Sequence, residues 1–598
     1  MFKTSTICRL TATWLILIAL SIIIAYCVTS SVEWLPTATS KTGKFLLKKY
    51  NEISHISFLT LLALSCGLLL RQALNASQQN NPHNPPALSR AHQLIRGIKE
   101  HPVTTALFAF YTVIMIRQAS WFYKEIISWY KDIFNYHLLD NFSLRWSFVK
   151  ETMFRNDFRF FPLSHQDLHI LSWLTPYVSI WMLVNAAELF TIVILGAKIA
   201  ERLSGKAKRK ETLLVFSLLF LFDTATGYTF FQFIYSERIV VLLLALFGFY
   251  YTKSHHTNQV KDQYLALLFA LLGLFFKDTA FILFTIPACT TILAGSMGFL
   301  PDKPRWSQTD LQTWIKCYEF EFYLCSLIGV LAVSFIYLSY LPSLYAGVDA
   351  YDSHLRFSRF EPDIRFIMLV LTCITRTILI VRRKISFSPL DALNAGAITY
   401  GLGLYAMVGF RSSNYMALPA QFIATINLVV LIIWLSSWLQ TKGWQSSVLS
   451  VAAVSASSGL IGMEYLGRDD FFHRISKMQS NQDSWVKTYD QIDKISKIAR
   501  QEGDEVNIIY SKSWFRNRGH LERLKYDRLV YYDLDAGTYT IMDGINKGAP
   551  YVPKKGDILL NIDTGKRLKE FGFDMSPYKQ IWTYGDHKTN GKIYRKLQ

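Results

Sequence analysis

The sequence of 598 residues is poor in cysteine, and its C-terminal quarter has none. A domain held together by disulfides needs paired cysteines in its polar parts, and a cysteine-based metal site needs closely spaced thiols. Neither pattern is present, so the sequence indicates no disulfide framework and no cysteine metal site. The seven cysteines lie in or beside apolar segments and are Cys8, Cys27, Cys66, Cys289, Cys317, Cys325 and Cys373.

The sequence also lacks the short alternating segments that are typical of transmembrane β-barrels. Hydrophobic residues make up 51% of the chain and form blocks near the roughly 20 residues that a helix needs to cross a bilayer. We therefore predict an all-α polytopic membrane protein. Apolar run lengths predict about thirteen spans, near 10–28, 56–70, 103–116, 171–197, 213–229, 239–251, 264–276, 279–298, 322–340, 367–380, 392–408, 421–438 and 448–465.

The first apolar segment has no convincing small-residue cleavage site near Cys27, so we interpret it as an uncleaved anchor.

The formal net charge is +19, but Lys and Arg stand mostly at helix ends, where they orient a membrane protein rather than bind nucleic acid. The basic loops 198–210, 382–384 and 90–99 predict a cytoplasmic N-terminus. The lysines at 41–49 do not follow this pattern, because the same orientation places their loop on the outer side. An odd number of spans in a cytoplasmic (inner) membrane then places the C-terminal domain outside.

Composition predicts three parts. Residues 1–101 hold N-terminal spans and a cytoplasmic loop, 102–465 a transmembrane domain with a long outer loop at 120–169, and 466–598 a soluble domain. Helical spacing predicts an amphipathic helix over 483–501. Strand-like runs follow at 506–510, 528–532, 558–562, 580–584 and 592–594, which predicts a small α/β domain.

Several charged residues of separate loops are expected at the outer ends of the spans. Charges at the rim of a span are costly unless they are solvated or paired, so a cluster on one side indicates a functional site. Each residue taken alone is more often a snorkelling or ion-paired group. The loop 120–169 supplies Asp132, Asp140, Asp157, Arg159, His165 and Asp167, and outer turns add Asp223, Glu237, Arg238, Lys277, Asp278, Arg411 and Tyr415.

The chain resembles the GT-C superfamily of membrane glycosyltransferases, especially branches similar to protein O-mannosyltransferases and bacterial polyprenyl-phosphate-sugar transferases. Four elements carry this resemblance over about 103–438: an acidic residue in the first large outer loop, the sequence Phe-Arg-Phe-Phe-Pro-Leu at 158–163, Glu237 after a tight turn, and Phe-Lys-Asp-Thr-Ala at 276–280. The turn Phe-Arg-Ser-Ser-Asn-Tyr at 410–415 is similar to the Arg-Tyr element of many members. Many members have adjacent acidic residues in the first loop. This chain has none there, so the identity of the catalytic acid stays open.

The resemblance implies transfer of a sugar from a polyprenyl-phosphate-linked donor to a glycan, lipid or protein acceptor outside the membrane. A carboxylate would take the proton of the acceptor hydroxyl, and cations would hold the leaving phosphate. Asp140 is the first candidate for the base, ahead of Asp132 and Asp157. The phosphate ligands would be Arg411, Lys277, Arg238 and Tyr415, and the substrate would be positioned by Arg159, His165, Asp167 and Asp278. Glu237 would orient the acceptor or pair with Arg238 or Lys277.

No cofactor is predicted. His165 and His169 are four residues apart and could share a helix face near Asp167, but the further ligands of a divalent metal site are not evident. The predicted partners are the lipid bilayer, the donor and the acceptor, without nucleic acid. Three alternatives remain: a transporter or flippase for lipid-linked saccharides, a glycan polymerase or ligase, and a non-enzymatic assembly protein.

Overall fold

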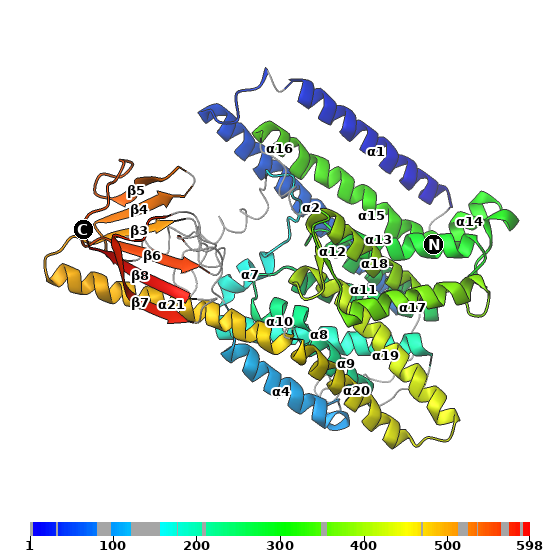
Figure 1. Ribbon diagram of the computed structural model, residues 1–598. Coiled ribbons are helices and arrows are strands. Elements are labelled where there is room, and N and C mark those ends of the chain that lie inside the picture. The colour runs from blue at the N-terminus through cyan, green and yellow to red at the C-terminus, as the bar shows by residue number, and fades with distance from the viewer. Residues whose placement is uncertain are drawn as a thin grey trace.

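The computed structural model describes residues 4–31, 34–79, 97–120, 156–175, 177–205, 211–347, 356–467, 470–511, 524–534, 536–563, 568, 573–585 and 590–597. These residues form a mostly helical body and a small C-terminal domain built on a sheet (Figure 1). The all-α class predicted for the membrane region and the α/β class predicted for the C-terminal region are both observed.

The body consists of helices from α1 to α20. They are α1 (Thr4–Ser31), α2 (Lys41–Gln79), α4 (Pro102–Arg117), α7 (Gln166–Leu174), α8 (Val178–Ser204), α9 (Thr212–Leu221), α10 (Thr224–Phe231), α11 (Glu237–Thr257), α12 (Val260–Gly273), α13 (Phe281–Ser296), η3 (Trp306–Gln308), α14 (Leu311–Cys317), α15 (Glu319–Phe335), the π-helical η4 (Ile336–Tyr340), α16 (Leu341–Ala346), α17 (Ile364–Val381), α18 (Pro389–Val408), η6 (Tyr415–Ala417), α19 (Leu418–Thr441) and α20 (Ser446–Leu466). The long helix α21 (Phe471–Gln501) leads into the C-terminal domain.

Among the described residues, six helical segments are long and apolar enough to cross a membrane. They are Lys41–Ser77, Val178–Ser204, Glu319–Ala346, Ile364–Val381, Tyr415–Thr441 and Ser446–Leu466. Helices α9 and α10 pass the same test together but meet at an angle of 71°. Helices α4 and α13, with 16 residues each, are apolar but shorter. The prediction of about thirteen crossings therefore stays a prediction.

One predicted span is divided in the structure. The proline at position 176 predicts a break near the outer end of the span 171–197, and the structure has one there: α7 ends at Leu174 and α8 begins at Val178. Residue 176, a proline in the sequence, lies outside the described residues. A proline lacks the N–H group that an α-helix interior uses and restricts the residue before it, which explains why a helix ends here.

The core of the body is packed around α19, which contacts α8, α9, α11, α17, α18 and α20. Asn394 and Asn427 face each other across α18 and α19, and each side-chain amide donates a hydrogen bond to the other, with distances of 2.9 and 2.6 Å. Buried amides of this kind are stable because their hydrogen bonds are made within the protein. At Gly196 of α8, a Cβ atom would lie 2.2 Å from the Phe216 ring, so only glycine lets α8 and α9 approach this closely.

The C-terminal domain contains one six-stranded sheet. Its strands are β3 (Asn507–Ser511), β4 (Arg528–Asp533), β5 (Thr538–Gly544), β6 (Ile558–Asp563), β7 (Tyr578–Gly585) and β8 (Asn590–Lys596), and their order is β5-β4-β3-β6-β8-β7. The central strand β3 is parallel to β4 and β6, whereas β5, β7 and β8 form antiparallel pairs. Central strands buried on both faces favour continuous apolar runs such as Ile508-Ile509.

The predicted strands appear with small shifts of their ends, but β5 was not predicted. It is an edge strand in which Ile541 alone is buried, so its apolar signal is weak. The predicted helix over 483–501 was too short at its N-terminal side. Asp470 caps α21, because its carboxylate accepts a hydrogen bond from the backbone N–H of Phe472 at 2.8 Å, and the helix therefore begins at Phe471.

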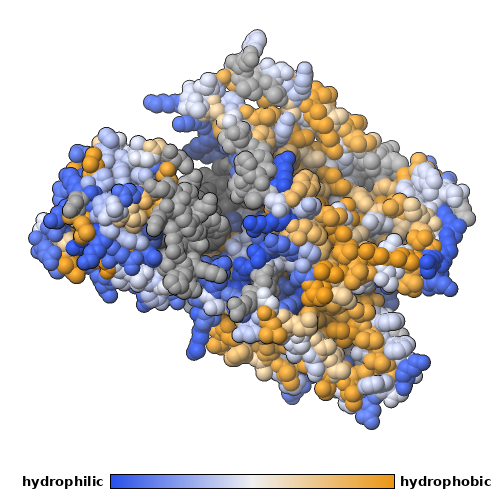
Figure 2. All heavy atoms as spheres, in the orientation of Figure 1, coloured by the Kyte–Doolittle hydropathy of each residue, from blue (hydrophilic) through white to orange (hydrophobic). Residues whose placement is uncertain are grey.

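Helix α21 connects the body to the C-terminal domain. Its first part packs against α10, and its later part contacts β7 and β8 (Figure 1). At Gly227 of α10, a Cβ atom would lie 2.6 Å from the Phe471 ring. Figure 2 shows hydrophobic atoms over the body that carries α13, α15 and α17, whereas hydrophilic atoms cover the C-terminal domain and the end of the body that faces it.

Two short strands lie at this same end of the body. They are β1 (Phe360–Glu361) and β2 (Phe410–Arg411), which pair in parallel just before α17 and α19 begin.

Candidate functional site

The segment 156–165 crosses one end of the body without regular secondary structure. Three contacts hold it there: the N–H of Leu163 donates to the carbonyl of Phe275 at 3.0 Å, the N–H of Phe158 to the hydroxyl of Ser343 at 2.9 Å, and the Ser339 hydroxyl to the carbonyl of Arg159 at 3.0 Å. Because these partners belong to the turn after α12 and to η4 and α16, the segment joins two parts of the body.

Arg238 is a buried cation with three side-chain partners at this end. Its guanidinium is 1% exposed and donates to Asp167 at 2.5 Å, to Glu188 at 2.6 Å and to Asn185 at 2.8 Å. An arginine fork can satisfy several acceptors at once, and a buried arginine needs them. Arg238 therefore ties the start of α11 to α7 and α8. Sequence reasoning missed Glu188, although an acidic residue within an apolar helix is itself a signal for a buried partner.

Lys277 and Glu237 form a second ion pair. The Lys277 ammonium lies 2.8 Å from Glu237 Oε1, and the side chains are 15% and 1% exposed. The same ammonium lies 5.8 Å from the centre of the Tyr415 ring, and this ring stacks on Tyr235 at 3.9 Å. Lys277 precedes α13, Glu237 opens α11 and Tyr415 precedes α19. Three separate turns thus meet at one cation.

Arg159 and Asp278 form a third pair, in which Arg159 Nε donates to the Asp278 carboxylate. Both side chains are partly exposed, at 21% and 17%. The backbone N–H of Arg159 also donates to Asp157 Oδ1 at 3.3 Å. The structure therefore brings Asp157 and Arg159 of the 156–165 segment beside the turn that carries Lys277 and Asp278.

The two histidines of the 156–169 region lie among these charges. Burial lowers the pKa of His165 to about 3; the charge of Asp167 raises it, and His169, Lys277 and Arg238 lower it further. Burial also lowers the pKa of His169, to about 4. Both imidazoles are thus neutral near pH 7. In the part of the chain that the structure describes, no group of three or more His, Cys, Asp or Glu side chains has the arrangement to hold a metal ion.

The low pKa of His165 predicts a loss of stability in acid. In the unfolded chain a histidine takes up a proton as the pH falls through about 6.5, whereas folded His165 does so only near pH 3, so the unfolded state binds more protons between these values. The contribution of neutral His165 to the free energy of unfolding is therefore fully present above about pH 6.5. It is lost as the pH falls toward about 3. We expect thermal denaturation of the His165→Asn variant to depend less on pH in this window than that of the parent protein.

Asparagine suits this variant because His165 has a φ of 63°, a conformation that asparagine tolerates. The control is His256→Asn, at an exposed position at the far end of α11. An identical pH dependence of His165→Asn and the parent would contradict the prediction.

Arg411 belongs to the β1–β2 pair. Its Nε is 3.1 Å from Glu361 Oε2, and the two side chains are 40% and 51% exposed. The same turn continues to Tyr415, whose ring lies near the Lys277 ammonium. Of the predicted site residues, Asp132 and Asp140 lie outside the described residues.

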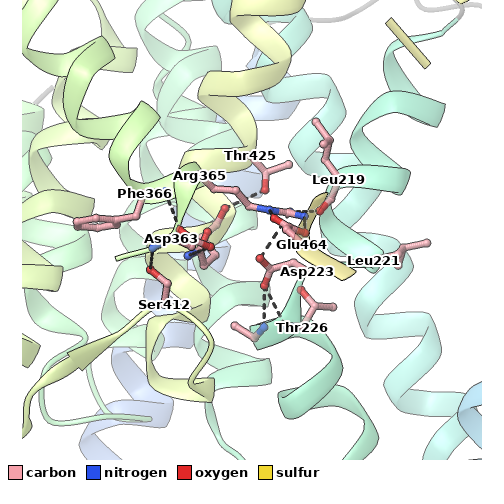
Figure 3. Close-up of polar contacts among 12 residues, drawn as sticks. Leu219, Leu221, Asp223, Thr226, Asp363, Arg365, Phe366, Ser412, Thr425 and Glu464 are labelled. Atoms are coloured by element: carbon pink, nitrogen blue, oxygen red, sulfur yellow. Dashed lines mark hydrogen bonds and ion pairs between the residues drawn. The ribbon is translucent and has the colours of Figure 1, made fainter. Parts of the chain in front are cut away.

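A further ionic cluster lies next to this end of the body and includes Asp223, one of the charges expected at the outer ends of the spans (Figure 3). Arg365, at the start of α17, is fully buried. It donates twice to the Glu464 carboxylate, at 2.7 Å each, and lies 3.5 Å from Asp223 Oδ2. Asp223 caps α10 through the N–H groups of Ala225 and Thr226, at 2.9 and 3.1 Å. This cluster therefore fixes the bend between α9 and α10 against α17 and the end of α20.

Asp363 connects the Arg365 cluster to the β1–β2 pair. Its carboxylate caps α17 by accepting from the N–H of Phe366 at 2.9 Å, and it accepts from the Gln421 amide, also at 2.9 Å. Its own N–H donates to the Ser412 hydroxyl at 3.1 Å (Figure 3). A partly buried hydrogen bond thus holds the turn at 411–415 against the start of α17.

The site as a whole combines carboxylates and cations at one partly exposed end of an apolar body. Such an arrangement can take up a proton and hold an anionic group near the membrane surface. Comparison of the chain with protein-family models, with curated proteins and with solved structures gives no match. The functional argument therefore depends on the geometry of these side chains.

Proposed function

We propose that the protein is a membrane glycosyltransferase of GT-C type that transfers a sugar from a polyprenyl-phosphate donor to an acceptor. The observation that carries this proposal is the meeting of Lys277, Glu237 and Tyr415 from three separate turns beside the 156–169 segment. A lipid-linked phosphate lies near the membrane surface, so a partly exposed cation at a helix end is well placed to bind it.

The proposal includes an orientation for the chain. Helices α11, α13, α17 and α19 all begin at the charged end, and basic residues follow their opposite ends, including Lys303, Arg305, Arg382, Arg383, Lys384 and Lys442. Basic loops favour the cytoplasmic side. We therefore assign the charged site and the C-terminal domain to the outside of the cytoplasmic membrane, with the N-terminus in the cytoplasm and thirteen crossings.

The residues have separate roles in the proposed reaction. The acceptor oxygen attacks the anomeric carbon, its proton passes to a carboxylate, and the bond between that carbon and the phosphate oxygen breaks. Negative charge then develops on the polyprenyl phosphate, where Lys277 and Arg411 stabilise it. Arg238 is fully engaged with Asp167, Glu188 and Asn185, so we assign it to positioning.

The base is an acid of the 120–169 region, with Asp140 first and Asp157 next. Asp157 lies beside Arg159 and the Lys277 turn, which supports it as the alternative. Glu237 is 1% exposed and bound to Lys277, so its assigned role is to orient this ammonium.

A transporter of lipid-linked saccharides is the second candidate, because α9 and α10 form a broken helix with buried charges at the bend. A transporter moves its substrate unchanged, whereas a transferase releases polyprenyl phosphate. Polymerases and ligases use the same donors and differ from a single-sugar transferase in the length of the product.

The decisive experiment incubates the purified full chain with a panel of polyprenyl-phosphate sugars and follows the release of polyprenyl phosphate. We expect release with at least one donor, and a reduction of about a hundredfold in Asp140→Asn, since general base catalysis contributes at least this much. Asp157→Asn is the matched comparison. If Asp140→Asn retains full activity and Asp157→Asn loses it, the base is Asp157. Movement of intact donors across proteoliposomes without release would favour the transporter.

A further inference from the structure

A groove lies between α4 and the first half of α21, on the side of α10 where Phe222 and Phe471 pack. Its volume is about 790 Å³, which is in the range of binding sites for small ligands. The walls come from the apolar helix α4, from α21 and from the end of β7 in the C-terminal domain. The groove thus joins the helical body to the C-terminal domain.

One end of the groove is apolar and open. Phe110 and Ile114 of α4, together with Phe222 and Phe472, line it, and Phe110 and Phe472 are 65% and 45% exposed. Helix α4 consists of apolar residues over nearly its whole length. This end of the groove is therefore continuous with a surface that suits hydrocarbon chains.

The other end of the groove offers hydrogen-bonding groups. Gln118, Gln479, Ser480, Asp483 and Tyr584 line it. The Gln479 amide donates to the carbonyl of Gln118, and the Gln482 amide donates to the carbonyl of Ala119 at 3.3 Å, which fastens α21 to the end of α4. Among the described residues that line the groove there is one carboxylate and no lysine or arginine.

We propose that this groove binds an uncharged glycolipid, with its hydrocarbon chain along α4 and its sugar against α21. A carboxylate accepts hydrogen bonds from sugar hydroxyls, and a side-chain amide can both donate to them and accept from them. A phosphate head group would instead meet the Asp483 carboxylate without a compensating cation among the described lining residues, which disfavours anionic phospholipids. The gradient from apolar to polar lining gives the ligand one orientation.

Helix α21 also lies against the charged site through its other side chains. The Arg474 guanidinium lies 4.8 Å from the centre of the Tyr228 ring, and Tyr228 contacts Tyr415 with ring centres 5.6 Å apart. If the proposed function holds, the glycolipid belongs to the acceptor class; this assignment rests on the proposed function, whereas binding in the groove does not.

The test uses the full chain in nanodiscs of phosphatidylcholine that contain a photoreactive monoglucosyl diacylglycerol. We expect crosslinks to peptides of α4 and of the first half of α21, and competition by unlabelled glycolipid but not by phosphatidylglycerol. Ser476→Trp fills the groove and should reduce labelling at least about tenfold. Asp483→Asn should weaken binding about tenfold, which is the loss expected when a hydrogen bond to a charged group is removed.

Two exposed positions of α21 outside the lining provide matched controls. Lys477→Trp introduces the same side chain one residue from Ser476, and Asp490→Asn makes the same change as Asp483→Asn two turns further along. Both should label like the parent. Labelling that Ser476→Trp leaves unchanged, or that phosphatidylglycerol abolishes equally well, overturns the proposal.

Binding and transfer are measured separately, so the two proposals can fail independently. Glycolipid labelling without release of polyprenyl phosphate from any donor would support the groove and remove the proposed function. Transfer without labelling in the groove would do the reverse.

Discussion

Lys277→Met is expected to reduce sugar transfer about a thousandfold. The variant removes one of the two cations proposed to stabilise the leaving phosphate, and loss of one preorganised stabilising group typically costs a hundredfold to a thousandfold in rate. Lys277 also holds Glu237, which is 1% exposed and opens α11. The measurement is the rate of polyprenyl phosphate release by the purified protein at saturating donor.

The effect on transfer has to be separated from an effect on folding. Without Lys277 the buried Glu237 carboxylate lacks its cation, so we expect a loss of about 3 kcal/mol of stability. The double variant Lys277→Met/Glu237→Gln removes both charges and should recover part of this stability without recovering transfer. Activity restored in the double variant would contradict a role of Lys277 at the phosphate.

The opposite end of the body offers a matched control. Lys303 lies 3.9 Å from Glu321, a carboxylate that is also 1% exposed. Lys303→Met therefore leaves a buried glutamate without that cation, as Lys277→Met does, but far along the helices from the proposed site. We expect Lys303→Met to be destabilised while retaining transfer.

Arg365→Met is expected to give the largest loss of stability, about 3 to 5 kcal/mol. Arg365 is fully buried and is shared by Glu464 and Asp223, so its removal leaves two carboxylates without their cation. Arg365→Lys keeps a charge but loses the pair of parallel hydrogen bonds to Glu464, so it should lie between Arg365→Met and the parent. The measurement is reversible unfolding of the protein in mixed micelles.

Two further variants test whether the buried ion cluster causes the loss of stability in Arg365→Met. Arg376→Met breaks the pair with Asp391, whose members are 26% and 9% exposed, and should cost less because water replaces part of the lost interaction. The triple variant Arg365→Met/Asp223→Asn/Glu464→Gln removes all three charges and should be more stable than Arg365→Met alone. Equal losses in Arg365→Met and Arg376→Met would show that burial of the Arg365 cluster is not the determining factor.

Much of the architecture follows from the order of residues along the chain. Apolar runs such as 421–438 specify long helices, because in a nonpolar environment the backbone must satisfy its own hydrogen bonds. The β-branched run at Ile508-Ile509 specifies a buried strand in the same local way. Local hydrophobicity does not predict the edge strand β5, because only Ile541 is buried in it.

The candidate site was predictable in part. Glu237, Lys277 and Tyr415 each stand at a turn before a helix, so the sequence places them at the same end once the helices alternate in direction. It left open whether Glu237 pairs with Arg238 or Lys277. Neighbouring side chains of a helix point about 100° apart, so Glu237 faces α13 while Arg238 faces α7 and α8.

The sequence by itself determined that this chain is mostly helical, with apolar segments long enough to cross a membrane, a mixed α/β C-terminal region and charges at the ends of its helices. Only the tertiary structure decided which charges meet. Arg365 and Glu464 are 99 residues apart, and Arg238 and Glu188 are 50 apart. Hydropathy and periodicity describe each helix by itself, whereas the neighbours of a helix and the direction of its buried charges depend on how all the helices pack.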